Sequence, residues 1–288
     1  MTATRRRRAF GQHFLKDQSV IDAIVRTTFE EVERSAAKAL LEVGPGKGAI
    51  TRALLEQVEK TPSLGRFLIV EKDTRLAEVF DEECKGRAGV EVVTADFLDV
   101  KAEVYLRDEP LVVVSNLPYS AGTAILQELA VYPGKIPAMI LMFQAEVAAR
   151  LRAKPREKAW GSLSLWIQNR WEVKKLLAVP PRAFIPPPDV NSEVVVLKAR
   201  EKILVPPPEG ASPEEIAHWN TNWEKLIRIP FLHRRKMLRS GLPQNSVWKE
   251  ALEKAGIEGT RRAEELDWQD WTNWMHALHT LTFKFNDS

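Results

Sequence analysis

Five short apolar segments, separated by stretches with helical patterning, constrain the fold of this chain more than any other feature of its sequence. Each segment has four to six residues and is rich in aliphatic side chains. Roughly twenty residues separate each segment from the next, which is enough for a crossover helix. This pattern predicts a mostly parallel sheet with helices on its faces, in the α/β class. The five segments are residues 39–43, 67–70, 90–93, 111–114 and 138–143.

Two later apolar runs extend the predicted sheet. Residues 167–173 and 194–197 lie close together in the sequence and are predicted to close the sheet as an antiparallel pair. The triple-proline run at 206–208 then begins a stretch rich in proline, glycine and serine, which predicts an interdomain linker over residues 204–213. We therefore predict a first domain over residues 1–203.

The remaining residues, 214–288, have helical patterning to the end of the chain. Ser212 and Pro213, followed by two glutamates, form a typical helix start. Six of the nine tryptophans lie in this part of the chain, and three of them recur at helical spacing together with a leucine. We interpret this stripe as the core of a small all-α domain and not as a platform for nucleobases. Its members are Trp268, Trp271, Trp274 and Leu278.

The composition excludes several classes of protein. Hydrophobic residues make up 44% and charged residues 28%, which excludes a mostly disordered chain. The single cysteine, Cys84, cannot form an internal disulfide or a cysteine-rich zinc site, so we expect a reducing compartment and no metal. No apolar run approaches the length of a membrane span, and no apolar segment of a signal peptide follows the N-terminal arginines. We expect a cytoplasmic monomer without a membrane part.

Basic residues gather in two places, although the net charge of +3 predicts no partner by itself. One cluster lies in the first sixteen residues and the other between residues 228 and 239, and neither stretch contains an acidic residue. Two interpretations are open: solvated faces, or contacts with the phosphates of a nucleic acid. The residues concerned are Arg5, Arg6, Arg7, Arg8, Arg234, Arg235 and Lys236.

A glycine-rich turn follows the first predicted strand. Gly44, Gly46 and Gly48 alternate with other residues and lead into a predicted helix. Glycine allows a sharp turn and a close approach of a ligand to the backbone, and the following helix offers free N–H groups. The crowded spacing departs from the dinucleotide-binding fingerprint, so a pyrophosphate is not the expected ligand.

Acidic residues follow the next two predicted strands. Glu71 stands 27 residues past Gly44, and a carboxylate there can accept hydrogen bonds from both hydroxyls of a ribose. Asp96 can accept from an adenine amino group, with Phe97 beside the ring. Either acid alone is also compatible with a helix cap. Together with the glycine turn they predict a ligand site at the carboxyl ends of the strands, in an order that resembles the class I S-adenosylmethionine-dependent methyltransferases.

The segment from Asn116 to Tyr119 follows the fourth strand and suits methyl transfer to an adenine amine. S-adenosylmethionine is already activated, so the protein mainly has to position the reactants. Two hydrogen-bond acceptors on the amine can aim its lone pair at the methyl group, and the Asn116 side chain and a backbone carbonyl near Leu117 can supply them. Pro118 makes the turn rigid, and Tyr119 can stack on the base. Because a paired base cannot enter such a pocket, the target must be unpaired or flipped out.

Taken in order, the motifs resemble the ribosomal RNA adenine N6,N6-dimethyltransferases, in particular the KsgA (RsmA) small-subunit family. The resemblance covers nearly the whole chain. It implies an α/β, class I S-adenosylmethionine-dependent methyltransferase domain (Rossmann-like, with a mostly parallel sheet) and a small all-α C-terminal domain. The matching segments are residues 10–15, 41–48, 70–73, 95–96, 116–119, 143–151, 161–164, 179–190, 234–236 and 262–266.

The resemblance also implies a reaction. The cofactor is S-adenosyl-L-methionine, and the target is N6 of two adjacent adenosines in the 3′-terminal hairpin loop of small-subunit ribosomal RNA. The partner is that RNA within a pre-small-subunit particle, with methylation coupled to late assembly. Asn116, Leu117, Pro118 and Tyr119 are implied to hold the target base, with Phe184 on its other side. The residues implied to line the cofactor site are Gln12, His13, Leu15, Gly44, Gly46, Glu71, Lys72, Asp96, Phe97 and Asn116.

Three other functions stay open on the sequence. A large-subunit adenine methyltransferase of the antibiotic-resistance type resembles the first domain, although the triple-proline segment and the basic second domain favour the small-subunit family. An assembly factor with dispensable catalysis is the second. A DNA adenine methyltransferase is the third, but its motif usually has aspartate in place of Asn116 or a second proline before the aromatic residue. Trp160 and Pro230 depart from the family's usual pattern, and Pro230 is predicted to interrupt a helix.

Overall fold

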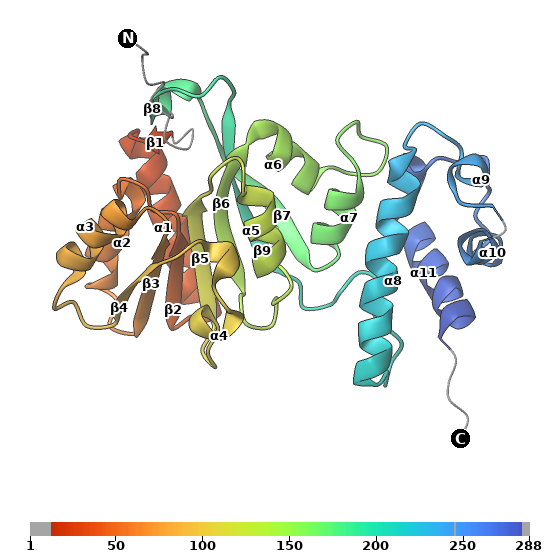
Figure 1. Ribbon diagram of the computed structural model, residues 1–288, viewed down its shortest axis with the longest axis horizontal. Helices are drawn as coiled ribbons and strands as arrows, with labels where there is room; N and C mark the ends of the chain where they lie inside the picture. Colours follow the sequence, from red (N-terminus) through yellow and green to blue (C-terminus); the bar gives the residue numbers. More distant parts are fainter. Residues whose placement is uncertain (1–12, 245, 284–288) are drawn as a thin grey trace, which may run out of the picture. The chain divides into compact units, whose positions relative to one another are not determined.

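The computed structural model describes residues 13–244 and 246–283 (Figure 1). Contacts divide these residues into two compact units. The first unit comprises the residues up to Ala148 together with Glu172–Ala199, and the second comprises Ala149–Trp171 together with the residues from Arg200 onward. Within the described residues, every helix is too short or too polar to cross a membrane.

The compact units divide the chain elsewhere than the predicted boundaries, 1–203, 204–213 and 214–288. The prediction assigned Ala149–Trp171 to the first domain, whereas the contacts group this segment with the helical unit. The physical reason is side-chain packing, because Trp160 and Leu165 are fully buried in the same hydrophobic cluster as Trp219 and Leu278. As limits of functional domains, the predicted boundaries stay a prediction.

The first unit is built on a seven-stranded sheet. The strands of this sheet are β2 (Ala39–Val43), β3 (Arg66–Glu71), β4 (Val90–Thr94), β5 (Leu111–Asn116), β6 (Ala138–Gln144), β7 (Trp171–Val179) and β9 (Ser192–Ala199). Their order in space is β4-β3-β2-β5-β6-β9-β7. A separate two-stranded antiparallel pair is formed by β1 (Phe14–Leu15) and β8 (Phe184–Ile185). The connecting helices are α1 (Gln18–Ser35), α2 (Ala49–Val58), α3 (Thr74–Cys84), η1 (Phe97–Asp99), α4 (Ala102–Tyr105), α5 (Gly122–Leu129), α6 (Ala145–Arg152) and η2 (Pro181–Ala183).

The strand directions follow the predicted pattern. β2 pairs in parallel with β3 and β5, β3 with β4, and β5 with β6, while β9 is antiparallel to β6. All five predicted strands are therefore confirmed. The predicted strand over residues 167–173 is wrong in its first part, because the helix α7 (Ser162–Gln168) occupies it and β7 starts only at Trp171. Asn169 caps the end of that helix, and its side-chain oxygen accepts the N–H of Val205 at 2.8 Å.

Hydrophobic residues bury both faces of the sheet. Leu40, Val112 and Ile140 pack in one cluster with residues of α1 and α2. Neighbouring residues of a strand point to opposite faces, and Leu41 and Val113 on the other face are also fully buried. Burial on both faces explains why these strands appear in the sequence as continuous apolar runs and not as alternating ones.

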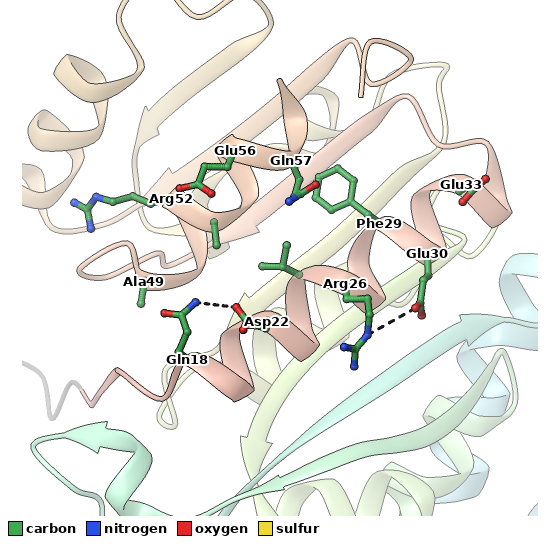
Figure 2. A pocket seen from close by; sticks show the side chains of 12 residues that line it. Gln18, Asp22, Arg26, Phe29, Glu30, Glu33, Ala49, Arg52, Glu56 and Gln57 are labelled. Atoms are coloured by element: carbon green, nitrogen blue, oxygen red, sulfur yellow. Dashed lines mark hydrogen bonds and ion pairs between the residues drawn. The ribbon is translucent and has the colours of Figure 1, made fainter. Parts of the chain in front are cut away.

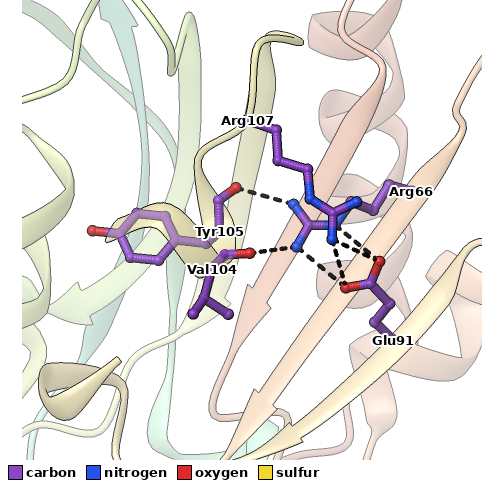
Figure 3. A network of polar contacts seen from close by, with 5 residues as sticks. All are labelled: Arg66, Glu91, Val104, Tyr105 and Arg107. Atoms are coloured by element: carbon purple, nitrogen blue, oxygen red, sulfur yellow. Dashed lines mark hydrogen bonds and ion pairs between the residues drawn. The ribbon is translucent and has the colours of Figure 1, made fainter. Parts of the chain in front are cut away.

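Arg66 organises the end of the sheet where β3 and β4 begin. Its side chain is only 5% exposed and donates to both carboxylate oxygens of Glu91, in β4, at 3.2 and 3.3 Å (Figure 3). It also donates to the backbone carbonyls of Val104 and Tyr105, and Arg107 adds bonds to the Glu91 carboxylate. A buried guanidinium needs such partners for its N–H groups. This network fixes α4 at the amino ends of the strands and leaves the carboxyl ends open.

The second unit is helical and rich in buried tryptophan. Besides α7, its elements are α8 (Pro213–Leu232), α9 (Leu238–Gly241), α10 (Val247–Lys254), η3 (Ala263–Glu265) and α11 (Trp268–Thr282). Ser212 caps α8 as predicted, since its hydroxyl accepts the N–H of Glu215 at 3.1 Å. Trp271, Trp274 and Leu278 are fully buried, and the partly buried Trp268 packs against the same cluster. The prediction that this stripe forms a core is confirmed.

Pro230 does not interrupt its helix, which corrects the prediction made from the sequence. The helix α8 continues to Leu232, and Pro230 is buried within it. A proline cannot donate the backbone bond to the carbonyl four residues earlier. Only two helical residues follow Pro230, so the one bond that it cannot donate lies near the C-terminal end of the helix.

Candidate functional site

The carboxyl ends of four neighbouring strands carry the predicted site residues. Glu71 ends β3 and Asn116 ends β5, while Gly44 follows β2 and Asp96 follows β4. The four strands are adjacent and parallel in the order β4-β3-β2-β5, so these residues lie along one edge of the sheet. That edge is where open α/β sheets bind ligands.

Two glycines of the turn after β2 have little or no room for a side chain. Gly46 and Gly48 adopt positive φ angles of 58° and 79°, a conformation that L side chains rarely adopt. A Cβ atom at Gly46 would lie 3.2 Å from the ring of Phe14, and one at Gly48 would lie 2.6 Å from the ring of Phe80. Gly44, also with positive φ, donates its N–H to the carbonyl of Val70 at 2.8 Å. At Gly46 and Gly48 the turn therefore has backbone only, while Lys47 between them is exposed and lies over the ring of Phe14.

Glu71 connects the glycine turn to the start of α3. Its carboxylate is 4% exposed and accepts the N–H of Gly46 at 3.0 Å and that of Asp73 at 2.8 Å, one on each oxygen. The helix cap of α3 is Asp73, whose side chain accepts the N–H of Arg75. Each oxygen of Glu71 keeps a further lone pair. The side chain is thus held in a fixed position and can still accept ligand hydroxyls.

A second carboxyl group lies behind this turn. Glu42 is in β2 and is 1% exposed, and its Oε2 atom has no hydrogen-bond partner among the described residues. Burial raises the pKa of Glu42 to about 8, and the nearby charge of Glu71 adds to the rise. A carboxyl group with this pKa is mostly protonated at pH 7. The pair therefore carries one negative charge, on Glu71.

Asp96 and Lys72 form an ion pair at the same edge. Lys72 Nζ lies 2.5 Å from one oxygen of Asp96, and the other oxygen accepts the N–H of Leu98 at 3.2 Å. The bond from Lys72 lowers the pKa of Asp96, and the same bond raises the pKa of Lys72. Asp96 therefore caps η1, in agreement with the alternative interpretation of this acid. The ring of Phe97 is 3% exposed and packs against Tyr105 at 5.1 Å, so only a small part of it can face a ligand.

The turn after β5 presents two free acceptors. The carbonyl of Pro118 accepts the N–H groups of Ala121 and Gly122 at 3.0 and 2.8 Å, which makes the turn rigid at the start of α5. Within the described residues, no hydrogen bond ends on the side-chain amide of Asn116 or on the backbone carbonyl of Leu117. Both acceptors proposed from the sequence are therefore without a partner in the described part of the chain, although Leu117 as a residue is only 2% exposed.

Tyr119 is held at two points. Its Oη atom lies 2.6 Å from Oγ of Ser192, and the centroid of its ring lies 5.7 Å from that of His13 at an interplanar angle of 32°. His13 in turn has its Nδ1 atom 2.7 Å from the carbonyl oxygen of Pro186. Burial raises the pKa of Tyr119, and the bond with Ser192 opposes that rise. The phenol is therefore neutral at pH 7 and keeps its proton for hydrogen bonding.

The β1–β8 pair places two further predicted residues in the core. Leu15 is opposite Phe184 in the register, and the two side chains are 6% and 1% exposed. Both belong to the hydrophobic cluster of the first unit. Phe184 is nearly fully buried, and within the described residues the ring beside Tyr119 is that of His13, so the predicted sandwich of a base between Tyr119 and Phe184 stays a prediction.

The basic cluster in the second unit separates into residues with different surroundings. Arg234 is bound to Glu264 at 2.6 Å and to the carbonyl of Glu157 at 3.3 Å, so this side chain is part of the packing of the helical unit. Arg235 and Lys236 are exposed, and no ion pair to either is present within the described residues. Gln12 and the predicted RNA contacts Arg5, Arg6, Arg7 and Arg8 lie outside the described residues.

Two surface hollows of the first unit are lined by none of the residues predicted to bind the donor, the target base or RNA. The first, of about 730 Å³, is a groove between α1 and α2, where Gln18 donates to Asp22 and Arg26 pairs with Glu30 (Figure 2). The second, of about 380 Å³, lies where β6 ends, and Gln144, Glu146 and Asn191 are among its lining residues. No group of three or more side chains suited to a metal ion occurs in the described part of the chain.

Ser192 is the site residue that the sequence interpretation missed. It is fully buried and stands 73 residues from Tyr119, its hydrogen-bond partner. Its signal in the sequence is a lone serine at the start of an apolar run, which is no different from any other serine at a strand end. Only the antiparallel pairing of β6 and β9, with Gln144 opposite Ser192, brings it to the site.

The order of the sheet and the residues along its carboxyl edge define a class I S-adenosylmethionine-dependent methyltransferase fold. A profile described as ribosomal RNA adenine dimethylase matches residues 3–280. The chain therefore belongs to the ribosomal RNA adenine dimethylase family, which confirms the family predicted from its motifs.

Curated relatives cover most of the chain. A ribosomal RNA small subunit methyltransferase A of Leptothrix cholodnii is 36% identical over 263 residues, which is 90% of this chain and 87% of the relative. A protein of the same name from Cereibacter sphaeroides is 38% identical over 264 residues, with 90% and 87% covered. These identities place the chain well inside the family.

Solved structures agree on the fold. A dimethyladenosine transferase from Plasmodium falciparum superposes with a TM-score of 0.69 at 21% identity, covering 91% of this chain and 96% of that one. The 23S rRNA methyltransferase ErmE superposes with a TM-score of 0.65 at 24% identity, covering 92% and 99%. The predicted fold class is confirmed.

Proposed function

We propose that this protein dimethylates N6 of two adjacent adenosines in the 3′-terminal hairpin loop of small-subunit ribosomal RNA, with S-adenosyl-L-methionine as the methyl donor. The observation that carries the proposal is the rigid turn after β5, which offers the free oxygens of Asn116 and Leu117 beside Tyr119. The family of the chain and the names of its curated relatives support the same reaction.

In the proposed mechanism, the turn after β5 makes the adenine amine a competent nucleophile. The lone pair of an exocyclic amine is delocalised into the ring, which makes the nitrogen planar and weakly nucleophilic. In the first transfer, the side-chain oxygen of Asn116 and the carbonyl of Leu117 accept one N–H bond each and draw the nitrogen toward a tetrahedral shape. In the second transfer, one of them accepts the single N–H bond that remains on the monomethylated amine. Tyr119 stacks on the base and so fixes the direction of the lone pair.

The residues that would hold the donor are those along the neighbouring strand ends. S-adenosyl-L-methionine supplies a methyl group on a positively charged sulfur, which needs no further activation. At Gly44 a side chain is missing and the nearest atom to its place is 3.9 Å away, so the donor could approach the backbone there, and Glu71 has lone pairs that could accept two ribose hydroxyls. Asp96 would accept a hydrogen bond from the adenine amine of the donor, with Lys72 and Phe97 next to it. His13, Leu15 and Gln12 would complete the site, as the resemblance to the family implies.

The proposed substrate is the RNA within a pre-small-subunit particle. Bases of a hairpin loop are unpaired and cheaper to extrude than bases of a duplex. The exposed side chains of Arg235 and Lys236 and the arginines at 5–8 are proposed to contact the RNA backbone. We further propose a cytoplasmic monomer whose activity is coupled to late assembly of the small subunit.

Labelled donor and small subunits that lack the modification test this proposal. The expected product is dimethyladenosine in the 3′-terminal loop, present with the natural protein and absent with Asn116→Ala. Preferential labelling of large-subunit RNA would instead support the resistance-type activity, and efficient labelling of duplex DNA would support a DNA enzyme. If Asn116→Ala restores small-subunit assembly in cells that lack the protein, binding is a function separate from catalysis.

Donor binding is tested separately by calorimetry. Glu71→Ala is expected to lose the hydroxyl contacts and to weaken donor affinity by roughly tenfold or more, since hydrogen bonds to a charged group contribute about 1.5–3 kcal/mol each. The matched control is Glu56→Ala, which removes an exposed carboxylate from α2. Equal donor affinity in both variants would contradict the assignment of Glu71.

A further inference from the structure

The side chain of Ser192 makes a hydrogen bond that is separate from the backbone pairing of its strand. It opens β9, opposite Gln144 of β6, and its side chain is fully buried. Its hydroxyl lies 2.6 Å from the phenol oxygen of Tyr119, at the short end of O–H···O distances. Within the described residues, the Ser192 side chain makes no hydrogen bond other than this one. The bond therefore connects the start of β9, which lies between β6 and β7 in the sheet, to the turn after β5.

Two contacts orient the ring of Tyr119, one at its hydroxyl group and one with the ring of His13. The hydrogen bond to Ser192 holds the hydroxyl end of the ring. The centroid of the His13 ring lies 5.7 Å from the centroid of the Tyr119 ring. His13 is itself anchored by the bond between Nδ1 and the carbonyl of Pro186. A tyrosine side chain has two rotatable bonds, and contacts at two separate points leave it little freedom. The ring is thus oriented before any base arrives.

We propose that Ser192 is a positioning residue that holds the ring of Tyr119 in the orientation in which the target adenine stacks on it. The inference rests on the proposed function, in which Tyr119 contacts the base. Ser192 itself is buried and acts through the tyrosine. Because Tyr119 follows Leu117 on one rigid turn, the fixed ring places the stacked base in register with the two acceptor oxygens.

The expected effect follows from the cost of ordering a side chain on binding. Immobilising a flexible side chain at an interface costs a factor of about 3 to 10 in binding. A ring held in advance avoids this cost, so its release is expected to raise KM for the RNA by about 3- to 10-fold. Donor affinity is expected to stay unchanged, since Ser192 touches none of the residues proposed to hold the donor.

A double-mutant cycle on the full-length protein tests the proposal. The natural protein, Ser192→Ala, Tyr119→Phe and the double variant are compared for kcat, for KM toward small subunits, for donor affinity and for free energy of unfolding. Both single variants are expected to raise KM by the same factor with kcat changed less. The double variant is expected to be no worse than either single one, because both substitutions remove the same bond.

Ser164→Ala provides the matched control. Ser164 is another fully buried serine, whose hydroxyl donates to the carbonyl of Arg150 at 2.6 Å in the second unit. It is expected to lower the free energy of unfolding as Ser192→Ala does, but to leave KM unchanged. Should Ser192→Ala fail to fold, Tyr119→Phe breaks the same bond from the other side and keeps the test decisive.

Two results would overturn the proposal. One is an unchanged KM in Ser192→Ala. The other is additive losses in the double variant, which would mean that serine and tyrosine act independently. Both presuppose an active natural protein. Absence of methylation by the natural protein would overturn the proposed function and this inference together, so the two failures are distinguishable.

Discussion

Glu42 shows how burial of a single residue affects the candidate site. This carboxyl group lies in β2, two residues before Gly44, and burial raises its pKa to about 8. Because Glu42 is mostly protonated at pH 7, Glu71 is not repelled by a second negative charge. Glu71 can then remain an acceptor on both of its oxygens, which its contacts with Gly46 and Asp73 require.

The pH dependence of stability tests the state of Glu42. Its pKa is raised in the folded protein from the ordinary 4.5, so between about pH 4.5 and 8 the folded state binds more protons than the unfolded state. The free energy of unfolding therefore decreases as pH rises through this window, by at most about 1.4 kcal/mol per pH unit from this group. Glu42→Gln is expected to remove that decrease, measured by urea unfolding at several pH values.

The control for Glu42 is Glu56→Gln, an exposed carboxylate on α2. Its curve of unfolding free energy against pH is expected to keep the slope of the natural protein. Parallel curves for Glu42→Gln and the natural protein would show that Glu42 ionises in the folded state at its ordinary pKa, and the account given above would be wrong.

For single residues, the sequence predicted position at the end of a strand better than it predicted burial of the side chain. Glu71 and Asn116 lie at the sheet edge because each ends or follows an apolar strand. Phe97 and Phe184 were expected beside a ligand, but both rings are nearly fully buried. An aromatic residue next to a motif has the same appearance in the sequence whether it faces a ligand or the core.

At the scale of elements, α10 and α11 show what holds the helical unit together. Trp274 is fully buried, and its indole N–H donates to the carbonyl of Trp248 in α10 at 3.1 Å. Trp271 stacks on Trp274 at 5.5 Å and is equally buried, yet its indole nitrogen has no hydrogen-bond partner in the described residues. The two side chains thus differ mainly in one bond.

Replacing each of these tryptophans by phenylalanine measures that bond. Both variants lose buried volume, but Trp274→Phe also leaves the carbonyl of Trp248 without its partner. We expect Trp274→Phe to cost about 1–2 kcal/mol more of unfolding free energy than Trp271→Phe. Chemical denaturation of the two variants gives the comparison, and equal losses would mean that the bond contributes nothing to stability.

At the scale of the whole molecule, basic residues that are neighbours in the sequence differ in whether they form ion pairs. Of the second basic cluster, Arg234 is bound to Glu264, whereas Arg235 and Lys236 are exposed and have no ion-pair partner within the described residues. In the sequence all three appear equivalent. The structure therefore narrows the proposed RNA contacts of this cluster to the two exposed residues.

Salt dependence of RNA binding separates these roles. Replacing Arg235 and Lys236 together by alanine is expected to lower the slope of log affinity against log salt by about 1.4, at about 0.7 for each phosphate contact with single-stranded RNA. Lys60→Ala, which removes an exposed cation from the turn after α2, is the control and is expected to leave the slope unchanged. Arg234→Ala is expected to lower unfolding free energy instead. An unaltered slope in the double variant would exclude both residues as phosphate contacts.

The sequence by itself determined the family, the parallel strands, the residues at their carboxyl ends and the tryptophan core of the helical unit. Each of these depends on local patterns, since a strand and the turn that follows it are encoded within some ten residues. Tertiary structure alone decided the strand order, the grouping of Ala149–Trp171 with the helical unit, and the bond between Tyr119 and Ser192. These depend on pairings between residues far apart in the chain, which no local pattern specifies.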